Sequence, residues 1–280
     1  MQINAYGMVN KNFGIYSDDL SGCDFMIETG SDYIACWCKD KAAGTVKAFE
    51  QFGFDVNAYT SFEKLFTDVQ LHSRLLTTHF NNVYCIWGHE TSICAPNELY
   101  SRGMAASAME LMFGAAIEQR SVIENTLGDC VISTAINEDA WDVYSRHYRI
   151  TANMHKYYSL LKIQKPTDEE DKLHLVFYNN DVIISAYKKG ALQLIQRFIY
   201  KTAEDVLYHI LNICKTYRLP VAEVNIRCSG MIDNSSPLYS TLLSYLGDFS
   251  FEIPDKSLFA AEGFHEYPLH YFLSFCQHDV

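Results

Sequence analysis

One stretch near the start of the chain decides the fold: Asp24-Phe25-Met26-Ile27-Glu28-Thr29-Gly30-Ser31-Asp32-Tyr33-Ile34-Ala35-Cys36-Trp37-Cys38. A polar turn at Thr29-Gly30-Ser31 interrupts two apolar runs, which is typical of a β-hairpin. Residues 45–52 then alternate and predict a third strand. Thr60, with Glu63 three residues later, predicts the N-cap and capping box of a helix. The stretch therefore opens a unit of three strands and a helix.

The second half of the chain repeats this order. Asn179-Asn180-Asp181 interrupts another apolar run, and strands are predicted over 173–178, 182–187 and 192–200. Thr202, with Asp205 at the box position, predicts the next capped helix. The corresponding pairs are Asp32 with Asp181, Lys39 with Lys188, Gly44 with Gly190, Phe52 with Phe198, Thr60 with Thr202, and Leu65 with Leu207. An internal repeat of this kind indicates architecture before any motif does.

Each half continues with the same alternation of strands and helices. The further predicted strands are 83–87, 92–95, 130–136, 224–228 and 249–253, and the further predicted helices are 98–113, 137–148, 237–246 and 269–276. A hairpin followed by crossover helices builds a mixed sheet that helices cover, so we expect the α/β class.

A polar, charged segment separates the two halves. Lys165-Pro166-Thr167-Asp168-Glu169-Glu170-Asp171-Lys172 has the composition of a surface linker. We therefore expect two lobes, residues 1–166 and 167–280, that face each other across a cleft. Clefts between lobes are favoured ligand sites.

Composition narrows the classes of partner. The chain has 22 basic and 34 acidic residues and a net charge of -12, which disfavours nucleic acid and anionic membranes as partners. We find no signal peptide and no run near the about 20 apolar residues that span a bilayer. The nine cysteines lie mostly in apolar runs, as buried reduced thiols do. These features predict a cytoplasmic protein that does not insert into a membrane.

At this point the chain resembles a known superfamily. A doubled unit of three strands and a helix is similar to the actin-like ATPases, which include sugar kinases, Hsp70-type chaperones and pilus-assembly proteins. Over nearly its whole length the chain resembles more closely an uncharacterised bacterial family of unknown function with an actin-like, ribonuclease H-like fold. The matching segments are 95–100, 198–208, 227–230 and 271–273. This family has no established activity to transfer.

The superfamily has a chemical signature that can be compared with this chain. The first hairpin turn of each lobe typically reads Asp-x-Gly-Thr, where Gly admits phosphates and Asp holds hydrated Mg²⁺. Here Glu28, Gly30 and Ser31 occupy the first turn, with Glu in place of Asp. The second turn, 178–181, has no Gly and no acid at the matching position. The turn that approaches adenosine usually has two glycines and here reads Ser229-Gly230.

The resemblance implies that Glu28, Gly30, Ser31, Ser229 and Gly230 are the candidates for binding ATP with Mg²⁺, although every element of the signature is degraded. Each has a structural alternative: Thr29-Gly30-Ser31 as a plain hairpin turn, and Gly230 as the residue that releases a strand into a loop. Cys36 and Cys38 have a spacing that suits a soft metal, but core packing explains them better. We assign no catalytic residue, no metal ligand and no firm cofactor.

Three functions remain open from the sequence. The favoured hypothesis is a non-catalytic pseudo-ATPase that acts as a scaffold for a protein partner. The first alternative is a nucleotide-binding ATPase or switch that uses Glu28, Gly30 and Ser31. The second alternative is a small-molecule binder in the cleft between the lobes, without Mg²⁺.

Overall fold

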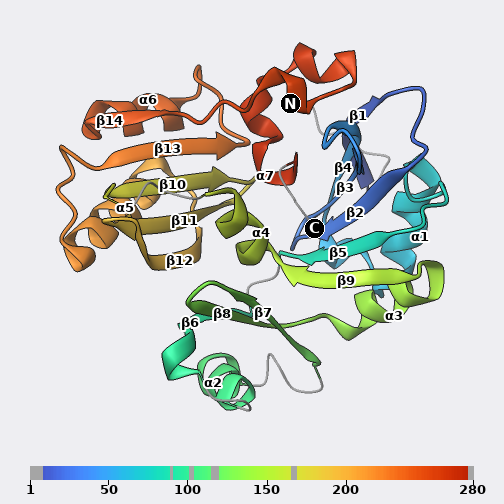
Figure 1. Cartoon of the computed structure of the whole chain (residues 1–280), viewed down its shortest axis with the longest axis horizontal. Helices are drawn as coiled ribbons and strands as arrows, with labels where there is room; N and C mark the ends of the chain where they lie inside the picture. Colours follow the sequence, from blue (N-terminus) through green and yellow to red (C-terminus); the bar gives the residue numbers. More distant parts are fainter. Residues whose placement is uncertain (1–8, 89–90, 101–103, 115–119, 165–168, 277–280) are drawn as a thin grey trace. The chain divides into compact units, whose positions relative to one another are not determined.

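The computed structural model describes residues 9–88, 91–100, 104–114, 120–164 and 169–276 (Figure 1). The chain divides into two compact units. One extends to Tyr158 and also includes Ser257–Glu266, and the other contains Ser159–Lys256 and the residues from Tyr267 onward. The predicted boundary between residues 166 and 167 lies outside the described residues. The chain returns to the first unit after it has built the sheet of the second.

A six-stranded mixed sheet forms the centre of the first unit, in the order β1-β4-β3-β2-β5-β9. Its strands are β1 (Val9–Tyr16), β2 (Cys23–Thr29), β3 (Tyr33–Asp40), β4 (Val46–Phe54), β5 (Val83–Trp87) and β9 (Ile150–His155). The first four pair antiparallel, whereas β2, β5 and β9 pair parallel. The predicted hairpin, third strand and 83–87 strand are confirmed, and β1 and β9 are additions that the sequence did not predict.

Two helices, α1 (Phe62–His72) and α3 (Glu138–His147), pack against one face of this sheet. Alternate residues of β2 and β3 lie in the same apolar core as Phe66 and Tyr144. The predicted N-cap of α3, Asn137, is confirmed by its bond from the Ala140 N–H, 3.0 Å long. The predicted cap of α1 is wrong by one residue, because the hydroxyl of Ser61, not of Thr60, accepts the bond from the helix.

A small antiparallel sheet is inserted between β5 and α3. It contains β6 (Ser92–Pro96), β7 (Val122–Leu127) and β8 (Cys130–Ala135) in the order β6-β8-β7, and α2 (Met104–Phe113) lies beside it (Figure 1). The predicted helix over 98–113 is shorter, because Asn97–Leu99 form a 3-10 turn and 101–103 lie outside the described residues. Asn125 of β7 connects the insertion to β9 by accepting the His155 N–H at 2.9 Å.

The returning segment completes the first unit. Phe259 forms a parallel bridge with Val46 at the start of β4, and the Ala260 N–H donates to the Val46 carbonyl at 2.9 Å. Phe259 and Phe264 are buried and pack on each other with ring centroids 4.9 Å apart. Gly263 lies so close to Ile15 of β1 that an added Cβ would be 3.2 Å from its side chain.

The second unit has a five-stranded sheet in the order β12-β11-β10-β13-β14. Its elements are β10 (Lys172–Phe177), β11 (Asp181–Lys188), β12 (Ala191–Ile199), α5 (Ala203–Tyr217), β13 (Asn225–Gly230), α6 (Pro237–Tyr245) and β14 (Asp248–Phe251). The pattern of antiparallel and parallel pairs matches that of β4-β3-β2-β5-β9. The predicted capping box of Thr202 and Asp205 is confirmed.

The end of the chain differs from its prediction. The expected helix over 269–276 is instead a 3-10 turn, Leu269–Tyr271, followed by a short helix α7 (Leu273–Cys276). The Phe272 N–H donates to the Leu269 carbonyl at 3.1 Å, an i to i-3 bond that tightens the backbone and interrupts a regular helix. The α4 helix (Lys156–Ile163) follows β9 and begins with a buried lysine.

Candidate functional site

The first candidate site is the turn between β2 and β3. Gly30 donates its N–H to the Tyr33 carbonyl at 2.9 Å, so Ser31 and Asp32 form a two-residue turn. Both turn residues are partly exposed, whereas Glu28 and Thr29 before them are buried. The three predicted residues Glu28, Gly30 and Ser31 therefore lie together around one turn.

Glu28 forms a buried ion pair. Its side chain and that of Lys156, the first residue of α4, are 0% and 1% exposed, and the Lys156 ammonium contacts the carboxylate directly. The Tyr33 hydroxyl donates a hydrogen bond to the other carboxylate oxygen. A carboxylate buried in this way is stable only because a cation and a donor compensate for the lost water. The acid that the resemblance to actin-like ATPases places at the Mg²⁺ position is thus already paired with a cation of the chain itself.

The Tyr33 ring covers Gly30. A Cβ added to Gly30 would lie 2.1 Å from the Tyr33 ring, so the ring rests directly against the glycine backbone. Tyr33 is only 6% exposed. The neighbouring Gly88 donates its N–H to the Thr29 carbonyl at 2.9 Å, and a Cβ there would be 3.4 Å from the Tyr33 hydroxyl. The absence of side chains at Gly30 and Gly88 makes room for Tyr33.

Sequence reasoning missed both Tyr33 and Lys156. Tyr33 looks like the first residue of an ordinary strand, and Lys156 is 128 residues away from Glu28 in the chain. No local signal marks Lys156 as buried, because only half of the residues in the preceding strand, Ile150–His155, are apolar. A buried lysine requires a counter-ion. Nothing in the sequence indicates which carboxylate supplies it.

The equivalent turn of the second unit has a different chemistry. Tyr178 donates its N–H to the Asp181 carbonyl at 2.8 Å, as Gly30 does to Tyr33. Asn180 accepts a bond from the Tyr200 N–H at 3.1 Å, as Asp32 does from Phe54 at 3.0 Å. Asp32 therefore corresponds to Asn180, and the predicted pairing of Asp32 with Asp181 is wrong by one residue.

This corrected register gives the equivalents of the signature residues. Glu28 corresponds to Val176, and Gly30 corresponds to Tyr178, and both equivalents are buried. Asp181 takes the place of Tyr33 and forms an ion pair with Arg197 of β12, whose Nε lies 2.6 Å from the carboxylate. A valine and a tyrosine provide neither a metal ligand nor an open backbone.

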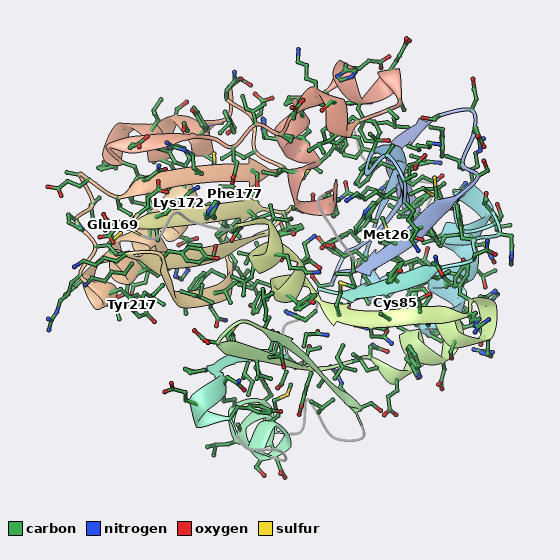
Figure 2. The ribbon with its side chains drawn as sticks, viewed as in Figure 1. Met26, Cys85, Glu169, Lys172, Phe177 and Tyr217 are labelled. Carbon is green, nitrogen blue, oxygen red and sulfur yellow. The ribbon has the colours of Figure 1, made fainter. Side chains whose placement is uncertain are left out.

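Ser229 and Gly230 end β13, in parallel register with Val176 and Phe177 of β10. Figure 2 labels Phe177, the last residue of β10, and Lys172, its first. Gly230 has a φ of +82°, and a Cβ there would lie 2.2 Å from the Phe177 carbonyl oxygen. The Met231 N–H donates to that same oxygen at 2.8 Å. Gly230 is therefore required for a close approach of two backbones, and Ser229 is buried beside it.

A second buried carboxylate in the first unit has a different set of partners. Glu50 of β4 is 0% exposed and faces the α1 side of the sheet between Ala48 and Phe52. It accepts hydrogen bonds from Lys11, Tyr16, Ser73 and the backbone N–H groups of Arg74 and Leu75. Burial alone would raise the pKa of Glu50, but these bonds, with that of Lys11 the strongest, hold it below its ordinary value.

We expect Glu50 to make the stability of the fold depend on acid. Because its folded pKa lies below the unfolded pKa, its contribution is complete above the unfolded value of about 4.3 and is lost as the pH falls through the folded pKa. Urea unfolding from pH 6 down to about pH 3 should therefore show a smaller loss of stability for Glu50→Gln than for wild type. Glu63→Gln, which alters an exposed carboxylate, is the matched control and should follow wild type. Equal slopes for wild type and Glu50→Gln would contradict the assignment.

The described residues also bear on metal binding and membrane insertion. Within them, no cluster of three or more His, Cys, Asp or Glu side chains has the arrangement of a metal site. None of the described helices combines the length and the apolar character needed to cross a bilayer. Cys36 and Cys38 are fully buried in the apolar core of the first unit, as their packing interpretation requires.

Comparisons with known proteins identify the family and the fold of the chain. A family model described as a protein of unknown function (DUF3822) matches residues 15–249. A Bacteroides thetaiotaomicron protein of unknown function, described as having an actin-like ATPase fold, is similar with a TM-score of 0.71 and 16% identity over 82% of this chain and 91% of that one. A type IV pilus biogenesis complex of PilM and PilN is similar with a TM-score of 0.59 and 10% identity, over 90% of this chain and 96% of that one. Among curated proteins no relative is found.

Proposed function

Because the chain belongs to the DUF3822 family of proteins of unknown function and has an actin-like ATPase fold, we propose that it is a non-catalytic member of that fold class, a pseudo-ATPase that acts as a scaffold for a protein partner. The proposal has two parts. The first is that the chain no longer binds and hydrolyses a nucleotide. The second is that its surface binds a protein partner.

The first part rests on the turn between β2 and β3. The three groups that a phosphate and its metal would need there are already in use. The Gly30 N–H is bonded to the Tyr33 carbonyl at 2.9 Å, the open side of Gly30 is filled by the Tyr33 ring, and the Glu28 carboxylate is paired with Lys156. These residues do not fit ATP with Mg²⁺, and we derive no phosphoryl-transfer step from them. Phosphoryl transfer needs metal, phosphate clamp and positioned water together.

The turn of the second unit supports the same conclusion independently. An acid and a glycine would be needed at the positions of Val176 and Tyr178, and both are occupied by buried side chains that cannot replace them. Position 230 requires a glycine because its backbone lies against Phe177 of the same sheet. This contact explains the glycine without a ligand. One turn without these groups could be compensated by the rest of a site, but two such turns support the loss of nucleotide chemistry.

The second part is supported by a structural neighbour. A chain that resembles this one comes from a structure described as a PilM-PilN type IV pilus biogenesis complex, so this fold occurs in a complex of two proteins. The identity of 10% transfers the fold and not the partner. A scaffold is the function that needs the fold and none of the missing nucleotide groups.

Thermal unfolding tests the first part. We expect ATP with Mg²⁺ at millimolar concentration to cause no shift in the melting temperature of the full chain that depends on Gly30. A ligand at 100 times its Kd would add about 2.7 kcal/mol to stability, which is easily measured. A saturable shift that Gly30→Ala removes and Gly128→Ala keeps would contradict the proposal and favour the nucleotide-dependent switch. Gly128 is the matched control because an added Cβ there meets nothing within 4 Å.

Native purification tests the second part. The tagged full chain, expressed in the cell that makes it, should elute with one protein in constant stoichiometry, and the mass of the complex measured by native mass spectrometry should give that ratio. A chain that elutes alone at every salt concentration used would contradict the scaffold while leaving the loss of nucleotide chemistry standing.

A further inference from the structure

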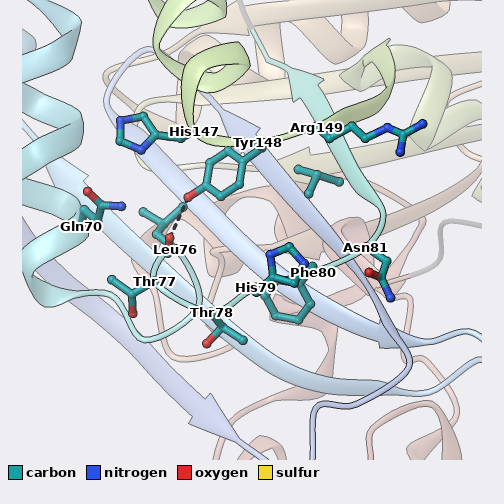
Figure 3. Close-up of a pocket in the computed structure, with 11 residues that line it drawn as sticks. Gln70, Leu76, Thr77, Thr78, His79, Phe80, Asn81, His147, Tyr148 and Arg149 are labelled. Carbon is teal, nitrogen blue, oxygen red and sulfur yellow. Dashed lines mark hydrogen bonds between the residues drawn. The ribbon is translucent and has the colours of Figure 1, made fainter.

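The first unit contains a cavity away from the turn between β2 and β3. It has a volume of about 550 Å³, within the range of about 300–1,000 Å³ that is usual for small-molecule sites (Figure 3). Its walls come from the end of α1, the loop between α1 and β5, and the chain from the end of α3 into β9.

The cavity and the turn lie at opposite ends of β5. Val83, the first residue of β5, lines the cavity, whereas Trp87, its last residue, pairs with Thr29 beside the turn. Four residue steps at roughly 3.3 Å each place the two ends about 13 Å apart. Ligands of open α/β sheets usually bind at the carboxyl ends of the strands. This cavity is at the amino end of β5 and is therefore a separate site.

One part of the wall is apolar and firmly held. Leu76, Phe80, Val83 and Tyr148 supply aliphatic surface and two aromatic rings. The Tyr148 hydroxyl donates to the Leu76 carbonyl at 2.8 Å, which fixes the ring against the loop (Figure 3). An aromatic or apolar body would find a preformed surface here.

The other part of the wall is a set of polar side chains that share one property. None of them has a side-chain hydrogen bond or ion pair with any residue that the structure describes. They are Gln70, His79, Asn81, His147 and Arg149. Thr77 and Thr78 also line the cavity, but their hydroxyls bond to backbone carbonyls of the same loop. His79, Asn81, His147 and Arg149 are exposed and Gln70 is partly exposed, so these side chains can turn toward a ligand in the cavity.

The charge of the cavity is opposite to that of the chain. The protein has a net charge of -12, yet no Asp or Glu lines the cavity, and Arg149 supplies a permanent positive charge. Two nearby acids are engaged elsewhere. Glu63 pairs with Arg146 at 3.1 Å, and Asp24 accepts a bond from Asn82 at 2.8 Å. An anion would therefore be attracted here and repelled by most of the remaining surface.

We propose that this cavity binds a small aromatic anion, a ring that carries a phosphate or carboxylate group. The ring would pack against Phe80 and Tyr148, and the anionic group would be held by the guanidinium of Arg149, the group best suited to planar recognition of phosphate or carboxylate. The side chains of His147 and Arg149 lie on either side of Tyr148, and the guanidinium of Arg149 extends away from the Tyr148 and Phe80 rings (Figure 3). Arg149 is exposed, so its side chain would turn toward the anionic group on binding. This site is independent of the pseudo-ATPase proposal.

Titration calorimetry with phenyl phosphate tests the site in the full chain. We expect saturable binding with one site per chain, and about tenfold weaker binding to Arg149→Gln, the usual effect of losing one charged hydrogen bond. Arg146→Gln is the matched control because Arg146 is an exposed arginine in the last turn of α3, three residues before Arg149, and does not line the cavity. It should bind as wild type does. Backbone amide shifts on binding should be confined to residues 70, 76–83 and 147–149.

Three results would overturn the proposal. They are the absence of saturable binding up to about 10 mM phenyl phosphate, equal affinity of wild type and Arg149→Gln, and amide shifts centred on residues 28–33. Inorganic phosphate and benzyl alcohol test the two halves of the ligand, and each should bind at least about tenfold more weakly than phenyl phosphate. If either binds as tightly, the aromatic anion is the wrong class.

Discussion

Lys156→Met is expected to lower the free energy of unfolding by about 3–5 kcal/mol, because it leaves Glu28 buried with no cation. The Glu28 side chain is 0% exposed and that of Lys156 is 1% exposed, so water cannot replace the lost ammonium. Methionine keeps most of the volume of lysine, and the loss therefore measures charge more than packing. Urea unfolding at neutral pH, followed by circular dichroism, gives the value.

Two comparisons make this result specific. Arg146→Met removes the cation of an ion pair whose side chains are 58% and 61% exposed, and such pairs contribute about 0–1 kcal/mol. The double variant Glu28→Gln with Lys156→Met should recover part of the loss, since no buried charge remains. If Lys156→Met costs no more than Arg146→Met, the buried pair does not stabilise the turn in the way described.

Gly230→Ala is expected to cost about 2–5 kcal/mol, although it adds only one methyl group. The residue has a φ of +82°, and its Cβ would lie 2.2 Å from the Phe177 carbonyl oxygen and 2.9 Å from the Phe177 nitrogen. The left-handed conformation costs roughly 1–2 kcal/mol for a residue with a side chain, and overpacking against fixed backbone adds roughly 1–3 kcal/mol. Thermal and urea unfolding both report the change.

Gly128→Ala isolates the steric part of this effect. Gly128 also has a positive φ, +55°, but nothing lies within 4 Å of its added Cβ. Only the conformational cost of roughly 1–2 kcal/mol should appear there. Equal losses for the two variants would show that the approach of Gly230 to Phe177 does not matter. The nucleotide interpretation of Gly230 would then regain support, because its glycine would need another explanation.

Local chemistry made much of the fold predictable. The hairpin of β2 and β3 has a polar turn between apolar runs, and the cap of α5 depends on Thr202 and Asp205, three residues apart. The β1 strand was missed for a physical reason. Its residues 10–12 are Asn-Lys-Asn, which have low strand propensity, and it lies at the edge of the sheet where few side chains need to be apolar.

The candidate site was predictable only in part. A turn with Gly30 could be located from neighbouring residues. Whether that turn is open to a ligand depends on contacts with distant residues, which the local pattern does not encode. The Lys156 partner of Glu28 comes from a distant helix start, and the rotamer of Tyr33 decides whether the backbone of Gly30 is open. The one-residue error between Asp32 and Asn180 arose likewise, since hydrogen bonds and not residue identity set the register of a hairpin.

The bridge from Phe259 to Val46 has a consequence for protein synthesis. Domains usually fold as they emerge from the ribosome, the N-terminal one first. Here the N-terminal half emerges with the start of β4 and the side of β1 at Ile15 still lacking their last neighbours, which are encoded more than 200 residues later. The first unit is therefore completed only after residues 257–266 have been made, and until then a nascent chain must keep that apolar surface from other molecules.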